Sequence, residues 1–364
     1  MITSANDQTH ESAAAAAPLA KRSLGRSGLK VSILGFGTAP LGDLYERLDE
    51  TVALATIAAA LDGGIRLFDT SPLYGSGLAE HRLGTGLRGA VREDLVISTK
   101  VGRWMDPWRK ASASSATAAK PATAAPGFAG GLPHRAVFDY SYDGTMRALE
   151  QSLLRLGMDH VEIALIHDVD VWTHGPDAIE GRVREVMAGS YPALQRLRDE
   201  GVVKAIGVGI NEAEMAERLV SMADLDCVLL AGRYSLLEQP ALDHFLPLAQ
   251  ERKIGVMLGG VFNSGILATG AVPRARYNYQ PAPAEILARV ARIEAVCQAH
   301  GVPLAAAAMQ FALGHPAVAT LVLGGVTPAE VSANIAALAS PAPAELWADL
   351  KAEGLLAPQV PVPA

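Results

Sequence analysis

Four side chains capable of acid-base chemistry, Asp69, Tyr74, Lys100 and His167, end or closely follow three short apolar runs. If these runs are neighbouring parallel strands, their carboxyl ends meet and the four groups converge. A buried ammonium favours the phenolate of a nearby tyrosine and lowers its pKa from about 10 toward neutral pH. The pattern indicates proton transfer to or from a substrate oxygen, as required when a hydride moves onto or off carbon.

These residue types suggest distinct roles. Tyr74 would relay the proton, Lys100 would tune its pKa, Asp69 would hold Lys100, and His167 would orient or polarise the substrate oxygen. Each residue alone also fits a structural role: Asp69 in a turn or helix cap, Lys100 in an ion pair, and His167 as a hydrogen-bonded core histidine. Their positions at three consecutive strand ends favour the catalytic interpretation.

The elements that must position these groups alternate along the chain. Short β-branched runs are followed by amphipathic or Ala-rich segments, as in repeated βα units. The expected strands are Ser32–Gly37, Arg66–Asp69, Leu95–Lys100, Val161–His167, Ala205–Gly209, Cys227–Leu230, Gly255–Gly259 and Thr320–Gly324, and expected helices include Thr51–Leu61, Tyr142–Leu156, Pro240–Glu251 and Pro328–Leu338. Eight such units predict an α/β fold of the (β/α)8 TIM barrel type. No Gly-rich dinucleotide fingerprint follows the first run, which disfavours an open doubly wound sheet.

The segments outside the repeats are expected to have separate roles. Residues 1–20 should form a disordered tail, since their Ala run is too short for a signal-peptide core, and 21–364 should form the barrel domain. Segments flanking Gly25 to Gly28 predict a hairpin at the barrel bottom. A low-complexity loop over about 104–137 follows the third strand, at the end where active-site loops lie.

Composition excludes several classes of function. A formal net charge of −7 gives no basic surface for nucleic acid or anionic lipid, and no long uncharged apolar stretch predicts a membrane span. The two cysteines, Cys227 and Cys297, lie far apart without metal-ligand spacing, so we expect buried thiols, no metal site and a cytoplasmic location. The oligomeric state is not readable from the sequence.

The motifs Phe68 to Gly75, Ile97 to Lys100 and Leu165 to Asp168 together resemble the aldo-keto reductase family. The resemblance extends from about Lys21 to Leu350. It implies a (β/α)8 barrel, a nicotinamide cofactor, and a catalytic tetrad that falls on Asp69, Tyr74, Lys100 and His167.

The resemblance also implies a cofactor site at the last four strands. Its expected residues are Asn211, Tyr234, Gly260, Val261, Phe262, Ser264, Gly324, Gly325, Thr327, Glu330 and Asn334. The chain departs from the commoner family pattern: of a Ser-Asn pair after the fifth strand only Asn211 remains, Ala231 stands in place of a glutamine, and Gly259 stands in place of the aromatic that stacks on nicotinamide. The Gly-rich segment around Asn263 still suits a pyrophosphate bound by backbone N–H groups.

Cofactor choice is expected to depend on the segment after the eighth strand. No basic residue lies between Thr320 and Pro341, so no side chain there can grip a 2′-phosphate. Glu330 stands four residues before Asn334, where a phosphate-binding arginine would be expected, and a carboxylate accepts a hydrogen bond from a ribose hydroxyl instead. NAD is therefore expected over NADP, although NADP stays possible. Thr327 to Glu330 is also a good helix capping box, and both roles can hold.

Further strings around Asp168, Arg233 and Phe262 resemble the aldose 1-dehydrogenase and pyridoxal 4-dehydrogenase branch of the family. This implies NAD-dependent oxidation of the C1 hydroxyl of an aldose, of the L-fucose, D-arabinose or D-galactose type, to a lactone. Pyridoxal oxidation, general aldehyde or ketone reduction, and a nicotinamide-binding regulatory subunit are the alternatives. Candidate substrate residues, each equally compatible with ordinary loop surface, are Trp104, Trp108, Asp168, Asp170 and Arg233.

Overall fold

Eight parallel strands close into a barrel in the computed structural model, which describes residues 19–107 and 127–363. Each strand pairs with the next along the chain, and the last pairs with the first, with Leu321 opposite Leu34. The strands are β3 (Leu34–Gly37), β4 (Leu67–Asp69), β5 (Val96–Val101), β8 (Ile163–His167), β9 (Ala205–Ile210), β10 (Cys227–Ala231), β11 (Gly255–Gly259) and β14 (Val318–Leu323). The sequence prediction of an α/β barrel is confirmed, and no expected strand end is displaced by more than two residues.

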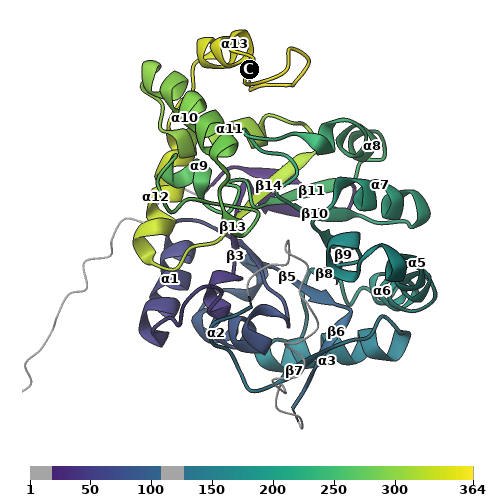
Figure 1. Ribbon diagram of the computed structural model, residues 1–364. Coiled ribbons are helices and arrows are strands. Elements are labelled where there is room, and N and C mark those ends of the chain that lie inside the picture. The colour runs from purple at the N-terminus through teal and green to yellow at the C-terminus, as the bar shows by residue number, and fades with distance from the viewer. Residues whose placement is uncertain (1–18, 108–126, 364) are drawn as a thin grey trace, which may run out of the picture.

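Helices surround these strands on the outside (Figure 1). They are α1 (Glu50–Asp62), α2 (Leu78–Gly86), α3 (Tyr142–Leu156), α4 (Val171–His174), α5 (Pro176–Glu185), α6 (Tyr191–Asp199), α7 (Ala213–Met222), α8 (Phe245–Glu251), α9 (Ile266–Thr269), α10 (Ala284–Ala299), α11 (Leu304–Leu313), α12 (Pro328–Ala339) and α13 (Ala344–Ala352). The helix expected from Pro240 is wrong at its start. A 3-10 turn covers Pro240–Leu242, and the α-helix begins only after His244, whose φ of −137° is not helical.

Local sequence explains why these elements form where they do. Every residue of β5 is buried, including Lys100, as expected for a strand covered on both faces. Ser141 caps α3 by accepting a hydrogen bond from Gly144 N, and Gly157 ends that helix in the left-handed conformation with φ of 64°. Helix α3, which precedes β8, is therefore capped at both ends, and β5 is enclosed in the core along its whole length.

A hairpin closes the amino-terminal end of the barrel, as the sequence predicted. Strands β1 (Lys21–Ser23) and β2 (Lys30–Ser32) are antiparallel, and Leu24 packs with Leu67 and Ile163 in the apolar layer at the strand starts. The residue before β1 is already bound to the barrel domain, because Ala20 O accepts a hydrogen bond from Ile33 N. The rest of the expected tail, residues 1–18, lies outside the described residues.

The loop expected over about 104–137 contains regular structure at both ends. Strands β6 (Arg103–Asp106) and β7 (Arg135–Phe138) form an antiparallel ribbon, with Arg103 opposite Phe138. Alternate residues of such a ribbon point to opposite sides, so each strand can face the barrel mouth and helix α3 at once. Figure 1 shows this ribbon beside α3.

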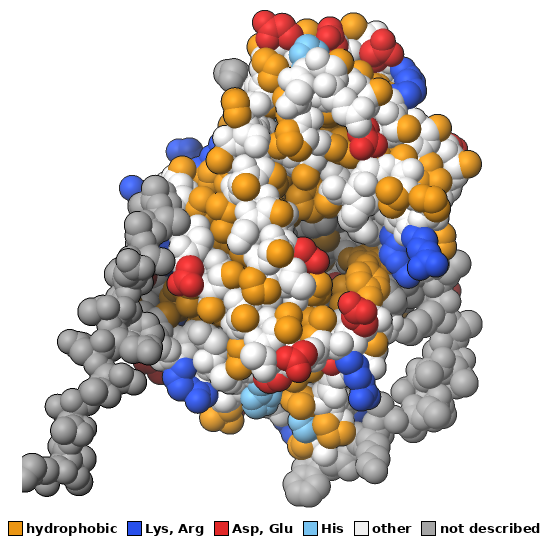
Figure 2. Space-filling view, turned by 90° about the vertical axis from the view of Figure 1, so that its left-hand side faces the viewer, with side chains coloured by type: hydrophobic (Ala, Val, Ile, Leu, Met, Phe, Trp, Pro, Cys, Tyr) orange, Lys and Arg blue, Asp and Glu red, His pale blue; other side chains and the backbone are white. Residues whose placement is uncertain are grey.

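Several surface and core features bear on the excluded functions. Cys227 and Cys297 are buried free thiols, as expected. On the face drawn in Figure 2, Lys and Arg side chains are scattered among acidic and apolar ones rather than gathered into one extended basic surface. Among the described helices none is by itself long and apolar enough to cross a bilayer, while α10 and α11 would satisfy length and composition together but are bent by 95°.

The hairpin predicts a steep stability cost at one glycine. Gly25 has φ of +53°, and a Cβ there would overlap Gly255 N and lie 2.5 Å from Lys253 O. Gly25→Ala should therefore lower the free energy of unfolding by about 2 kcal/mol or more, through backbone strain and overpacking. Denaturant unfolding followed by circular dichroism measures this.

Gly28→Ala is the matched control, because Gly28 has φ of +77° but nothing within 4 Å of a built Cβ. It should cost only the left-handed strain, about 1 kcal/mol. Equal losses in the two variants would show that the hairpin does not press against the barrel.

Candidate active site

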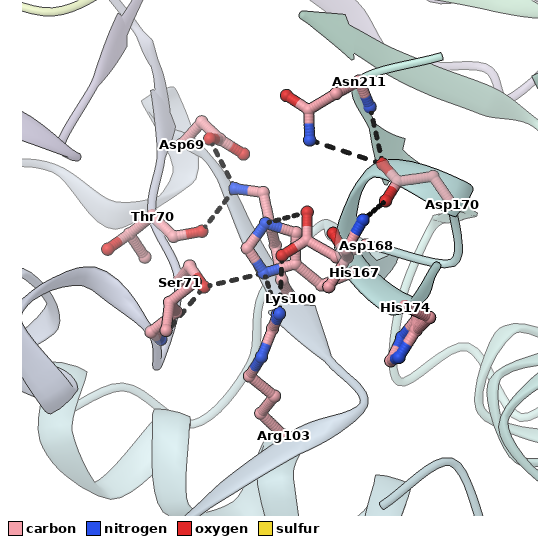
Figure 3. Close-up of polar contacts among 12 residues, drawn as sticks. Asp69, Thr70, Ser71, Lys100, Arg103, His167, Asp168, Asp170, His174 and Asn211 are labelled. Atoms are coloured by element: carbon pink, nitrogen blue, oxygen red, sulfur yellow. Dashed lines mark hydrogen bonds and ion pairs between the residues drawn. The ribbon is translucent and has the colours of Figure 1, made fainter. Parts of the chain in front are cut away.

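A buried ion pair lies at the centre of the barrel mouth. Lys100 Nζ lies 2.7 Å from Asp69 Oδ2 and donates to the carbonyl of Thr70 at 2.8 Å. Ser98 Oγ donates to the other carboxylate oxygen of Asp69 at 2.8 Å. Burial opposes the charge on Lys100, but the interactions with Asp69 and Tyr74 together outweigh it, so the pKa of Lys100 is raised. The lysine is held charged and in one orientation (Figure 3).

The neighbouring strand β9 leaves room for this lysine. A Cβ at Gly209 would lie 3.3 Å from Lys100 Cε and 3.8 Å from His167 Cδ2, in tight contact with the lysine. The missing side chain of Gly209 keeps space free between the lysine and the histidine.

Tyr74 lies above the ion pair, in the turn that follows β4. Lys100 Nζ is 4.9 Å from the centre of its ring, and the ring lies edge-on to His167 at 6.1 Å between centroids. Burial raises the pKa of Tyr74, the Lys100 charge lowers it, and the carboxylates of Asp69 and Asp168 raise it again. The expected net lowering is wrong for the protein by itself, because desolvation of the phenolate outweighs the ammonium.

His167 ends β8 and is buried between two polar groups. Its Nδ1 lies 3.2 Å from Ser71 Oγ and 3.2 Å from a guanidinium nitrogen of Arg103. Burial, followed by the charges of Arg103 and Lys100, holds the pKa of His167 well below its usual value. The imidazole is therefore neutral at physiological pH.

A second ion pair flanks the histidine. Arg103 Nη2 lies 2.7 Å from Asp168 Oδ2, and both side chains are about nine-tenths buried, with 7% and 11% exposure. The guanidinium carbon also lies 4.0 Å from the centre of the Phe138 ring. Figure 3 shows Arg103 approaching His167 and Asp168 from below. Sequence reasoning missed Arg103, although its position three residues after Lys100 at the same strand end was a usable signal.

These groups open into a cavity of about 420 Å³ at the carboxyl ends of the strands. Of the sequence-predicted residues, Tyr74, Lys100, His167, Asp168 and Asn211 line it, and Asp69 lies beneath. Sequence reasoning did not find its other polar and aromatic walls, which are Arg103, Phe128, Trp172, Thr173 and Tyr279. Arg103 comes from β6, Trp172 and Thr173 from the short helix α4, and Phe128 and Tyr279 from connecting segments, none of which belongs to the repeated βα units.

Two predicted substrate residues hold Asn211 instead of lining the cavity. Asp170 is completely buried, caps α4 through Thr173 N, and accepts hydrogen bonds from Asn211 N at 2.9 Å and Asn211 Nδ2 at 3.3 Å. Arg233 Nε donates to the Asn211 carbonyl at 2.6 Å. Both side chains therefore fix the backbone at the end of β9, where Asn211 faces the cavity.

The remaining predicted residues near the mouth lie elsewhere. Trp104 points away from the cavity and stacks under the Arg147 guanidinium at 3.6 Å, against α3. Tyr234 is buried and stacks on Phe311 with 5.2 Å between ring centroids, which places it in the core outside the barrel. Trp108 lies outside the described residues.

The loop after β11 is a tight turn that leaves some backbone N–H groups free. Gly260, Asn263, Ser264 and Gly265 all have positive φ; Asn263 N and Gly265 N donate within the turn to Gly260 O and Phe262 O, whereas the N–H groups of Phe262 and Ser264 make no hydrogen bond among the described residues. Asn263 Oδ1 is buried and has no hydrogen-bond partner in the part of the chain described. Ser264 Oγ accepts a hydrogen bond from Tyr279 N and thereby joins this loop to the cavity wall. Backbone N–H groups beside an unsatisfied buried amide fit the pyrophosphate and amide groups of a nicotinamide cofactor.

The segment between β14 and α12 starts with the expected capping box. Thr327 Oγ1 accepts from Glu330 N at 3.3 Å, and Glu330 Oε2 accepts from Val326 N at 2.9 Å. Gly324 and Gly325 precede this box, and Asn334 lies one turn further along α12, partly buried. One carboxylate oxygen of Glu330 thus binds backbone, and its other oxygen makes no hydrogen bond within residues 19–107 and 127–363.

Comparison with known proteins agrees with this arrangement. The model of the Aldo/keto reductase family matches residues 33–353. The chain is similar to a pyridoxal 4-dehydrogenase from Microbacterium luteolum, with 44% identity over 92% of this chain and 98% of the relative. It is also similar to a D-threo-aldose 1-dehydrogenase from a Pseudomonas species, with 39% identity over 91% of this chain and 96% of the relative.

A solved structure extends the similarity to three dimensions. The holo form of an aldo-keto reductase from Bacillus halodurans superposes with a TM-score of 0.71 at 25% identity, covering 94% of this chain and 98% of that one. The match spans all eight barrel strands and the four strand-end side chains described above. The chain therefore belongs to the aldo-keto reductase family and is an oxidoreductase that acts on alcohol or carbonyl groups.

Proposed function

We propose that this chain is an NAD-dependent dehydrogenase that oxidises the C1 hydroxyl of a cyclic aldose, of the L-fucose, D-arabinose or D-galactose type, to the lactone. The observation that carries the proposal is the cavity itself. It joins Tyr74 and His167, above the Asp69–Lys100 pair, to a second charged pair that can bind further hydroxyls. The 39% identity to an aldose 1-dehydrogenase supports this substrate class.

Tyr74 is the group that takes the hydroxyl proton in this proposal. The Lys100 charge favours its phenolate, and Asp69 keeps Lys100 charged against the cost of burial. When bound, NAD⁺ supplies the hydride acceptor and a further positive charge near the phenol. Once the substrate fills the cavity, water is excluded and the proton passes to Tyr74.

His167 is the donor that orients the substrate oxygen. Arg103 can only donate hydrogen bonds, so the His167 Nδ1 that it contacts is an acceptor without a proton. The proton of the neutral ring is then on Nε2. This N–H is available to hold the oxygen that Tyr74 deprotonates.

The cofactor would lie across the carboxyl ends of the last four strands. Asn211 would hold the carboxamide, and Gly260, Val261, Phe262 and Ser264 would hold the pyrophosphate. Gly324, Gly325, Thr327, Glu330 and Asn334 would hold the adenosine end. The free oxygen of Glu330 can accept a ribose hydroxyl but repels a phosphate, which favours NAD over NADP.

Pyridoxal is the second candidate substrate, because its hemiacetal form presents a similar secondary hydroxyl. Two observations favour it. The identity to a pyridoxal 4-dehydrogenase is 44%, and aromatic side chains of Phe128, Trp172 and Tyr279 line the cavity and suit a planar ring.

The first prediction of the proposed function concerns Tyr74. Purified protein should form NADH from NAD⁺ with at least one of L-fucose, D-arabinose and D-galactose, and Tyr74→Phe should lower kcat by about 10³-fold because the proton acceptor is lost. Initial rates at 340 nm measure this.

Tyr142→Phe is the matched control, since its phenol contacts Arg196 outside the cavity. It should retain full activity. Turnover of pyridoxal alone would move the assignment to the second candidate. Stoichiometric NADH binding without any turnover would favour a regulatory subunit.

The second prediction concerns cofactor choice. kcat/KM should be higher with NAD⁺ than with NADP⁺, and Glu330→Gln should narrow that ratio by about fivefold, since one repulsive charge near a phosphate is worth about 1 kcal/mol. Glu345→Gln, an exposed glutamate in the first turn of α13, should leave the ratio unchanged. A preference for NADP⁺ in the unaltered protein would contradict the proposal.

The third prediction concerns His167. ¹⁵N NMR of histidine-labelled protein should show the ring of His167 protonated on Nε2 and neutral through pH 6. His167→Gln assigns the signal. Arg103→Met should raise the pKa of His167, because it removes a positive charge that disfavours the imidazolium. Protonation on Nδ1 in the unaltered protein would contradict the proposed role.

A further inference from the structure

One carboxylate oxygen in the cavity, Asp168 Oδ1, can accept hydrogen bonds that the proposed reaction does not use. Asp168 Oδ2 pairs with Arg103, whereas Oδ1 lies 3.5 Å from His167 Nε2, beyond a good hydrogen bond. Within residues 19–107 and 127–363 the Asp168 side chain makes no other hydrogen bond. An ionised carboxylate accepts about four hydrogen bonds, so Oδ1 is an open acceptor inside the cavity.

The backbone holds this carboxylate in place at a cost. Asp168 has φ of 54°, a left-handed conformation that few residues other than glycine adopt. Asp168 N donates to Gly209 O at 2.9 Å, and the Tyr140 hydroxyl contacts the carbonyls of both His167 and Asp168, at 2.8 and 3.3 Å. Strained residues fixed from several sides cluster at ligand sites.

The position of Oδ1 relates it to one part of a substrate. A reacting oxygen held by His167 Nε2 lies about 2.9 Å from that nitrogen. A hydroxyl oxygen on the adjacent carbon lies about one hydrogen-bond length from that reacting oxygen. With Nε2 and Oδ1 3.5 Å apart, that second oxygen can donate to Oδ1 while the first stays on His167.

We propose that Asp168, oriented by Arg103, recognises a hydroxyl on the carbon next to the one oxidised, so that the enzyme selects substrates with two adjacent hydroxyl groups. This inference rests on the proposed function and narrows it: for an aldose, the recognised group is the C2 hydroxyl. A substrate without that hydroxyl leaves Oδ1 desolvated and without a donor, which costs most of a charge-assisted hydrogen bond.

Paired sugars test the inference on the unaltered enzyme. D-arabinose and 2-deoxy-D-ribose differ only in the C2 hydroxyl, as do D-galactose and 2-deoxy-D-galactose. With saturating NAD⁺, kcat/KM for each deoxy sugar should be about 10- to 100-fold lower than for its parent. Equal values within a pair would overturn the inference and leave the proposed function standing.

The variant Asp168→Asn tests whether Asp168 is the residue that distinguishes the parent sugars from the deoxy sugars. The parent sugars should lose activity and the deoxy sugars much less, so that the ratio within each pair narrows to about threefold. Asp159→Asn, at a side chain with 88% exposure, should leave the ratio unchanged. An unchanged ratio in folded Asp168→Asn would overturn the inference even if the unaltered enzyme discriminates.

The unaltered enzyme keeps the test decisive if Asp168→Asn does not fold, because the sugar pairs need no variant. If neither L-fucose nor any member of the two pairs is oxidised, the aldose proposal is overturned together with the inference. Discrimination against both deoxy sugars would support the inference independently of the variant.

Discussion

Lys100 carries a charge in a place where charges are costly, and the barrel mouth is organised around it. Its side chain is 1% exposed, and transferring an ammonium from water to such surroundings costs several kcal/mol. Asp69 offsets that cost from the neighbouring strand β4, the Thr70 carbonyl adds a second acceptor, and Gly209 on β9 leaves the volume the lysine occupies. A barrel that did not close with these strands in register would leave the ammonium without partners.

The two ion pairs lie next to different catalytic groups of the cavity. The Asp69–Lys100 pair lies under Tyr74, and the Arg103–Asp168 pair lies beside His167. Both cations disfavour a proton on His167, whereas the carboxylates oppose the phenolate of Tyr74. Burial and the two cations keep His167 neutral, whereas burial and the two carboxylates raise the pKa of Tyr74 against the opposing charge of Lys100.

The strands and the positions of the four tetrad residues could be predicted from the sequence, because alternating βα units and residues at strand ends follow from local sequence pattern. The residues that form the inner wall of the cavity could not be predicted in this way. Arg103 and Trp104 are adjacent in the chain, yet one faces His167 and the other faces α3, because they lie on a ribbon with a two-residue period. Asp170, Arg233 and Tyr234 were expected at the mouth, but side chains this near a mouth can turn into the wall, and only the fold decides which do.

Because the β6–β7 ribbon is anchored on both sides, the number of residues between its two strands can change without changing the shape of the candidate active site. Arg103 and Phe138 face each other across its first rung, and at the far side of the insertion Ala129 N and Leu132 N are bound to Asp43 O and Gly75 O. Because closing a loop between fixed ends costs entropy that grows only slowly with length, residues can be gained or lost between these anchors at small cost. The fold therefore has a place where the length of the chain between Asp106 and Ala129 can vary without moving the two ion pairs at the barrel mouth.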